Sequence, residues 1–133
     1  MRPHLAVTAL LAACLVSGAA LAANDRVEST FESFAASGVT GEASINPMPD
    51  GNTQIHAALR GLEPSTEYVA LVYTASQSCA DGTSSLRIVE FESNPAGVVT
   101  WNDKVAEPLA SLRSIGIRKV EGNTLVACAS IAP

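Results

Sequence analysis

The feature that most constrains the fold of this chain is a series of short apolar runs separated by turn residues. Residues 53–59 alternate strictly, with Ile55, Ala57 and Leu59 on one face, and a period of two residues is the signature of a half-buried strand. Successive turns lie about ten residues apart, a spacing typical of an all-β sandwich or small barrel. We therefore predict an all-β domain.

The runs between the turns give the positions of the expected strands. Turn residues cluster at Asp50-Gly51, at Ser93 to Gly97 and at Glu121 to Asn123. Residues 26–36 fit either a strand or a helix, because Val27, Phe31 and Phe34 also match helical spacing; we favour a strand. The other expected strands are 39–45, 53–59, 67–74, 86–91, 98–101, 115–120 and 124–131.

Two of these runs carry more specific expectations. The run 67–74 is the clearest strand, and residues 68–73 offer no polar face, so we expect it to be covered on both sides. Residues 86–91 are expected to alternate, with Leu86, Ile88 and Glu90 on one face.

The N-terminus has the pattern of a cleaved secretory signal peptide. Arg2 precedes an apolar run, 5–21, that holds no charged residue, and small residues stand at Ala20 and Ala22. We expect residues 1–22 to be the signal and residues 23–133 to be one domain without a stable membrane span, in the periplasm or outside the cell. The alternatives are a short membrane helix and a lipoprotein anchored at Cys14.

The cysteines support an oxidising compartment. Only Cys79 and Cys128 lie beyond the signal, and two cysteines in an exported chain most simply form a disulfide. A metal site is disfavoured because no CxxC motif is present and His56 is the only histidine after residue 22. A redox-catalytic pair is disfavoured because the two cysteines are far apart in sequence.

Composition excludes one class of partner. The chain has 8 Lys and Arg residues against 13 Asp and Glu, and its net charge is −5. Phosphate backbones are bound by clustered basic side chains, so we expect no nucleic-acid partner. The apolar fraction of 47% is sufficient for a packed core.

The order of these segments resembles the copper/zinc superoxide dismutase family. The resemblance covers about residues 26–132 and implies an eight-stranded Greek-key β-sandwich. In that family a loop cysteine pairs with a cysteine of the final strand, which implies the same pairing here for Cys79 and Cys128. The segments that carry the resemblance are Gly38-Val39-Thr40-Gly41, the run from Ile55 to Leu62, Cys79-Ala80-Asp81-Gly82, Ala96-Gly97-Val98 and the run from Leu125 to Ile131.

The same resemblance implies that the catalytic site of the family has been lost. The family's first two copper-ligating histidines fall at Tyr68 and Ala70, and its guiding arginine falls at Leu125. No histidine follows His56, so one imidazole remains, and one imidazole cannot hold a redox-active copper ion. We expect no cofactor and no dismutase activity at this site.

The remaining candidates have ordinary structural interpretations. We expect His56 to be a surface or half-buried residue, because a general base needs a positioned partner. Tyr68 and Tyr73 are expected to pack in the core with their hydroxyls at its rim. Trp101 is expected to be a core residue rather than a recognition hot spot.

The sequence thus predicts an exported, superoxide dismutase-like β-sandwich with a non-catalytic binding or structural role, whose partner is a protein or a component of the cell envelope. Fold alone does not assign function, and two alternatives stay open. One is a periplasmic metal-handling or superoxide dismutase-related enzyme that uses a different site. The other is an immunoglobulin-like or fibronectin-like adhesion module, suggested by the segment from Gly61 to Tyr68.

Overall fold

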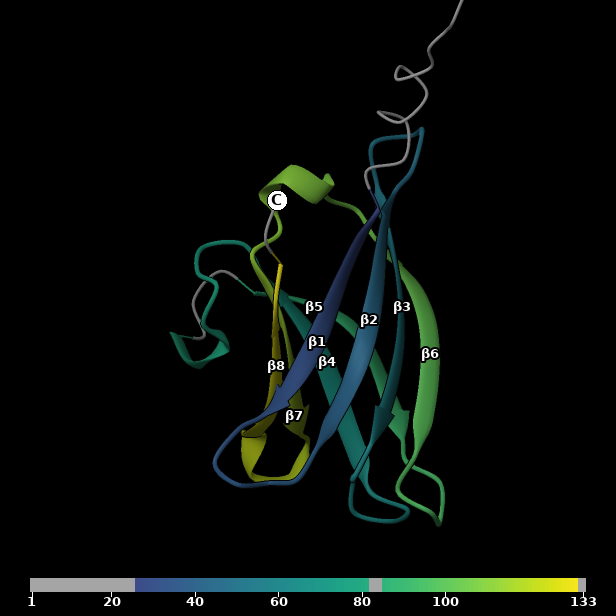
Figure 1. The fold of residues 1–133 in the computed structure, drawn as a ribbon, viewed down its shortest axis with the longest axis vertical. Helices are drawn as coiled ribbons and strands as arrows, with labels where there is room; N and C mark the ends of the chain where they lie inside the picture. Colours follow the sequence, from purple (N-terminus) through teal and green to yellow (C-terminus); the bar gives the residue numbers. More distant parts are fainter. Residues whose placement is uncertain (1–25, 82–84, 132–133) are drawn as a thin grey trace, which may run out of the picture.

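Eight antiparallel strands form the fold (Figure 1). The computed structural model describes residues 26–81 and 85–131; the signal predicted at residues 1–22, with Cys14, lies outside them. In the described residues the only helical elements are three short 3₁₀ turns, η2 (Cys79–Asp81), η3 (Leu109–Ser111) and η4 (Glu121–Asn123). The strands are β1 (Val27–Ser33), β2 (Thr40–Pro47), β3 (Thr53–Arg60), β4 (Glu67–Tyr73), β5 (Ser85–Glu92), β6 (Val99–Val105), β7 (Ser114–Lys119) and β8 (Thr124–Ser130). The prediction of an all-β domain is confirmed.

The strands curl into a nearly closed, flattened barrel in the order β5-β4-β7-β8-β1-β2-β3-β6. We call β1, β2, β3 and β6 the front sheet and β5, β4, β7 and β8 the back sheet, as they are seen in Figure 1. The two sheets are joined where β1 pairs with β8, with Glu32 opposite Cys128. β5 and β6 are the terminal strands, and no hydrogen-bonded ladder joins them in the described part of the chain.

The N-terminal segment forms a strand and not a helix. Val27 to Phe31 pair residue by residue with Ile45 to Gly41 of β2. Phe31 is fully buried in the main core. Tertiary pairing has therefore decided between two local patterns that the sequence left open, as it often does for short segments.

The main core fills the space between the two sheets. Alternation places Ile55, Ala57 and Leu59 of β3 inside, each at most 1% exposed, as the sequence predicts. Trp101 of β6 also packs in this core and is 8% exposed. Burying such side chains is the dominant favourable term in folding.

Strand β4 is buried on both faces, as its unbroken apolar run predicts. Tyr68, Ala70 and Val72 point into the main core. On the outer face Val69 and Tyr73 are also buried. A second, smaller apolar cluster of Tyr73, Cys79 and Leu125, with Leu71 and Cys128 against it, covers part of this face.

The alternation predicted for β5 is wrong at Ile88. The ladder with β4 pairs Ala70 with Val89 and then Leu71 with Arg87, so Ile88 is skipped. This bulge lets the neighbouring residues Ile88 and Val89 both pack against the main core. A β-bulge inserts one residue and so shifts the faces of the residues beyond it.

No helix that is long and apolar enough to span a bilayer occurs among the residues that the structure describes.

Candidate functional site

The positions that the family resemblance assigns to copper ligands lie in the interior. Tyr68 is 1% exposed and Ala70 is fully buried, and both belong to the main core. The Tyr68 ring stacks on Phe91 with the ring centroids 5.8 Å apart. These positions therefore serve core packing.

The position assigned to the guiding arginine is also a packing position. Leu125 is 6% exposed and lies in the small outer cluster with Tyr73 and Cys79. Cys79 and Cys128 form a disulfide between the segment after β4 and strand β8. The disulfide is part of this cluster.

The other sequence candidate, His56, lies on the outer face of the front sheet. It is exposed on β3, between Ser44 of β2 and Asn102 of β6 in the ladders. Among the described residues no group of three or more His, Cys, Asp or Glu side chains is arranged to hold a metal ion.

A more organised polar arrangement lies at the end of the barrel where four connections meet. We call this the turn end, and it is the lower end in Figure 1. Its connections are residues 34–39, 61–66, 93–98 and 120–123. Backbones approach closely there: a Cβ on Gly61 would lie 2.2 Å from the carbonyl oxygen of Gly38, and a Cβ on Gly97 would lie 2.2 Å from that of Leu62. Only glycine fits such contacts.

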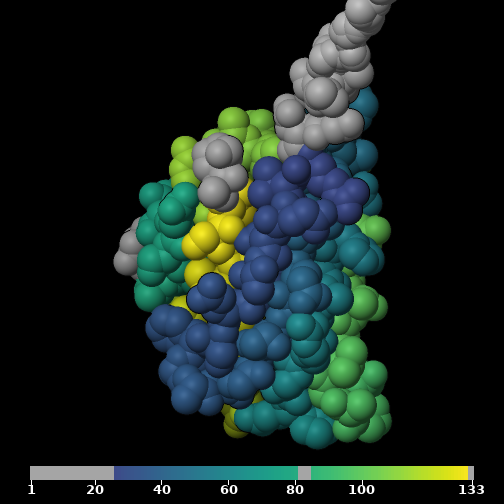
Figure 2. Space-filling model, in the orientation of Figure 1, coloured from purple at the N-terminus to yellow at the C-terminus, as the bar shows by residue number. Residues whose placement is uncertain are grey.

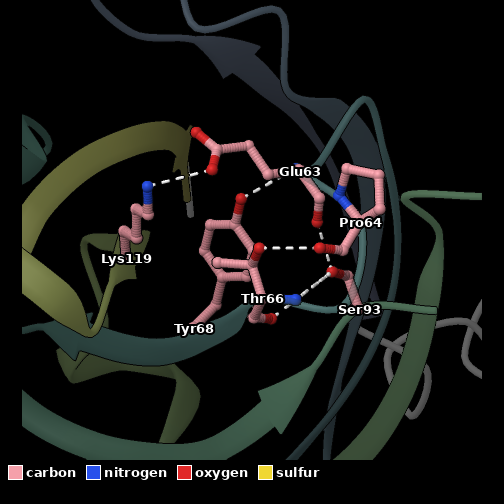
Figure 3. Close-up of polar contacts among 6 residues, drawn as sticks. All are labelled: Glu63, Pro64, Thr66, Tyr68, Ser93 and Lys119. Carbon is pink, nitrogen blue, oxygen red and sulfur yellow. Dashed lines mark hydrogen bonds and ion pairs between the residues drawn. The ribbon is translucent and has the colours of Figure 1, made fainter. Parts of the chain in front are cut away.

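Ser93 organises two of these connections (Figure 3). It is 3% exposed. Its hydroxyl accepts a hydrogen bond from the Thr66 backbone N–H at 3.1 Å and donates to the carbonyl oxygen of Glu63. The Ser93 backbone N–H donates to the Thr66 carbonyl at 3.0 Å. A buried hydroxyl that satisfies two backbone groups fixes the turn 61–66 against the turn 93–98.

Tyr68 and Lys119 hold the same turn from its other side. The Tyr68 hydroxyl accepts the Glu63 backbone N–H at 2.9 Å, so this aromatic side chain has a buried ring and a polar tip in the network (Figure 3). Lys119 of β7 donates to the Glu63 carboxylate at 2.9 Å. That hydrogen bond raises the pKa of the Lys119 ammonium above its ordinary value.

A hollow of about 360 Å³ lies beside this network, between the turns 61–66 and 120–123. The Val120 N–H donates to the Glu67 carbonyl at 3.0 Å and links its two walls. Its lining combines polar groups with one aliphatic side chain. The lining residues are Ser65, Thr66, Glu67, Val120 and Glu121.

Backbone strain and apolar exposure gather at the same end. In the described residues, every non-glycine residue with positive φ lies in a turn-end connection: Ala35, Ala36, Ser65 and Asn123. Such conformations cost roughly 1–2 kcal/mol each and concentrate at functional sites. Three of the four large apolar side chains described as exposed also lie here: Phe34, Val98 and Val120.

Sequence reasoning missed most of this arrangement. The sequence marks Ser93 only as the start of a turn, because the hydrogen bonds of its hydroxyl reach 27 and 30 residues back along the chain. Lys119 and Glu63 are separated by 56 residues. The one usable signal was the density of Gly, Pro and Ser in the turns 61–66 and 93–98.

Comparison with known proteins adds no family: no family model matches the chain, and a search of curated proteins finds no match.

Proposed function

We propose that this chain is an exported, non-catalytic binding domain built on a superoxide dismutase-like scaffold, and that it contacts a partner protein through the turn end. The observation that carries the proposal is that Tyr68, Ala70 and Leu125 serve packing. All three are buried packing residues, so the positions that would carry the family's chemistry maintain the fold instead.

The topology supports the scaffold. Two four-stranded halves meet at the β1–β8 pair, and the disulfide runs from the segment after β4 to the last strand, as the resemblance implies. Cys79 does not lie in a strand, whereas the disulfide expected of an immunoglobulin-like module joins strands of two facing sheets.

The turn end supports the binding role because its connections are held in place before any partner arrives. The hydrogen bonds of Ser93 and Tyr68 fix the turn 61–66, so little conformational entropy remains to be lost on binding. Val120, which is 41% exposed and borders the hollow, offers apolar area on this surface.

Two measurements test the catalytic half of the proposal. The exported protein is purified without a histidine tag, its copper and zinc contents are measured by mass spectrometry, and superoxide dismutation is assayed before and after incubation with both metals. We expect substoichiometric metal and no turnover above free copper. Stoichiometric copper with rapid turnover would overturn the proposal.

The binding half is tested by placing a photo-crosslinking amino acid at Val120 in the cells that produce the protein. A matched control carries the same amino acid at His56, which is exposed on the front sheet. We expect a discrete protein adduct from Val120 and none from His56. Equal adducts from both positions, or none from either, would count against the turn end as the contact surface.

A further inference from the structure

The connection after β1 contains a tight turn that its sequence does not favour. The Ser37 N–H donates to the Phe34 carbonyl at 3.1 Å, and the two central residues, Ala35 and Ala36, have φ of 55° and 57°. Positive φ at both central positions is the mark of a type I′ turn, for which Asn, Asp and Gly are preferred because a Cβ is strained there. Among the described residues these alanines are the only adjacent non-glycine pair with positive φ. We call residues 34–37 the hinge turn.

The hinge turn lies in a stretch that is exposed throughout. Residues 32–38 are all exposed, whereas Phe31 before them and Val39 after them are buried in the main core. Phe34, within the hinge turn, is 40% exposed. Opening the turn therefore takes no apolar side chain of the connection out of the core.

The connection is held closed by hydrogen bonds of serine hydroxyls. The Gly38 N–H donates to the Ser33 hydroxyl at 2.8 Å, and the hydroxyls of Ser33 and Ser37 lie 3.1 Å apart. The Ser37 hydroxyl also donates to the Val126 carbonyl. Such bonds at the surface contribute modestly to stability, because water replaces them when the connection opens.

Strand β1 has a specific place on the barrel, and that place can receive an identical strand. In Figure 2 the dark blue atoms of β1 lie between the yellow atoms of β8 and the lighter blue atoms of β2. Val27 to Phe31 pair with β2, and Glu32 and Ser33 pair with β8. Phe31 fills the core and is fully buried. Two strand edges and a slot for one aromatic ring thus define what can bind there.

We propose that two copies of this chain exchange β1, so that the β1 of each copy occupies the equivalent place in the other barrel. The hinge turn opens, and its residues run between the two barrels with Ala35 and Ala36 at negative φ. The ladders of β1 with β2 and β8 re-form between chains, while the strain at the two alanines is released. Strain in a short hinge connection is a recognised cause of such domain swapping.

The rest of the fold is compatible with the exchange. Cys79 and Cys128 both follow the hinge turn in the sequence, so the disulfide stays within one chain in the monomer and in the dimer. The exchange involves one connection of the turn end, but it does not depend on the binding role proposed above. The partner that it implies is a second copy of this chain.

The oligomeric state is the first test. The exported protein is concentrated stepwise and analysed by size-exclusion chromatography with light scattering. We expect a dimer whose fraction rises with protein concentration and which returns slowly to monomer after dilution, because β1 has to unpair. A monomer at every concentration would overturn the proposal.

Crosslinking distinguishes strand exchange from an ordinary dimer. Thr30→Cys and Glu42→Cys place two exposed thiols opposite each other in the β1–β2 ladder, where a short bismaleimide can join them. We expect this reagent to link two chains in the dimer fraction and to link within one chain in the monomer fraction. The matched control is the pair Ser44→Cys and His56→Cys on β2 and β3. Both positions follow the hinge turn, so these thiols should link within one chain in both fractions. A dimer in which both pairs link within one chain forms without exchange and would overturn the proposal.

Substitutions at the hinge turn test whether strain drives the exchange. Ala36→Gly removes the Cβ from a residue with positive φ, so we expect the dimer fraction to fall several-fold. Ala36→Thr introduces a β-branched side chain, which positive φ accommodates poorly, so we expect the dimer fraction to rise several-fold. The matched controls are Ala96→Gly and Ala96→Thr, at an exposed alanine of the turn 93–98 whose φ is not positive; they should leave the dimer fraction unchanged. Equal dimer fractions for Ala36→Gly and the unaltered protein would show that strain at the hinge turn does not drive the exchange.

Discussion

Replacing Ser93 with alanine tests whether one buried hydroxyl holds the turn end together. The substitution removes an acceptor from the Thr66 N–H and a donor from the Glu63 carbonyl. A buried polar group that loses its partner costs about 1–3 kcal/mol. Ser93 is 3% exposed and both hydrogen bonds are partly buried, so water replaces the lost hydroxyl only in part. We therefore expect a loss of about 2–3 kcal/mol in the free energy of unfolding.

This loss is measurable by denaturant titration and by thermal unfolding. In a domain of this size 1 kcal/mol lowers Tm by about 4–5 °C, so Ser93→Ala should lower Tm by roughly 8–15 °C. The matched control is Thr66→Val, which removes a side-chain bond from Thr66 to the Pro64 carbonyl at 2.8 Å in the same turn. That bond is exposed, so its loss should cost under about 1 kcal/mol.

The comparison of the two variants tests whether the Ser93 hydroxyl holds the turn end together. If Ser93→Ala costs no more than Thr66→Val, the hydroxyl does not organise the turn end, and our proposal of a preorganised binding surface loses its main support. If Ser93→Ala is strongly destabilising, its effect on crosslinking from Val120 then measures how far partner contact depends on the fixed turn.

Three further substitutions probe the rest of the structure. Gly116→Ala should cost about 1–3 kcal/mol, because its Cβ would meet the Tyr73 ring at 2.7 Å; unfolding that matches the unaltered protein would mean that the ring is not seated there. Cys128→Ser removes a disulfide with a sequence separation of 49 and should lower the free energy of unfolding by roughly 2–5 kcal/mol. An unchanged melting temperature would show that the disulfide does not stabilise the fold. Arg60→Gln should return the pKa of Glu42, which the hydrogen bond from Arg60 lowers, to its ordinary value in an NMR titration. Because that pKa is lowered in the folded state, the pair's stabilisation is present at neutral pH and is lost as pH falls through the folded-state pKa; a Glu42 titration unchanged in the variant would contradict this cause.

The inner face of a strand was predictable where the alternation of apolar and polar residues is uninterrupted. The alternation of β3 gave its inner face correctly, because its register with β2 and β6 is continuous. The same reasoning was wrong in β5, where the bulge at Ile88 changes the register. Nothing in the composition of 86–91 marks the bulge, which depends on pairing with β4.

The sequence predicts that both faces of β4 are buried, but it does not predict which segment covers the outer face. The apolar run of residues 68–73 predicts that both faces are covered. It does not reveal the cover, because the segment 74–81, whose Cys79 packs with Tyr73, is made of small and polar residues. On β7 this segment lies against Gly116, and Arg118 donates a hydrogen bond to the Cys79 carbonyl. The sequence pattern marks neither residue.

The turn end was beyond prediction for a related reason. Its hydrogen bonds connect residues that are distant along the chain, and a serine that begins a turn gives no sign of what its hydroxyl will bind. What the sequence does predict is negative: a domain with one histidine beyond residue 22 cannot assemble an imidazole copper site. The structure adds that Tyr68 places an aromatic ring in the core and a hydroxyl in the turn-end network. One side chain thus couples the packing of the barrel to the shape of the surface proposed for binding.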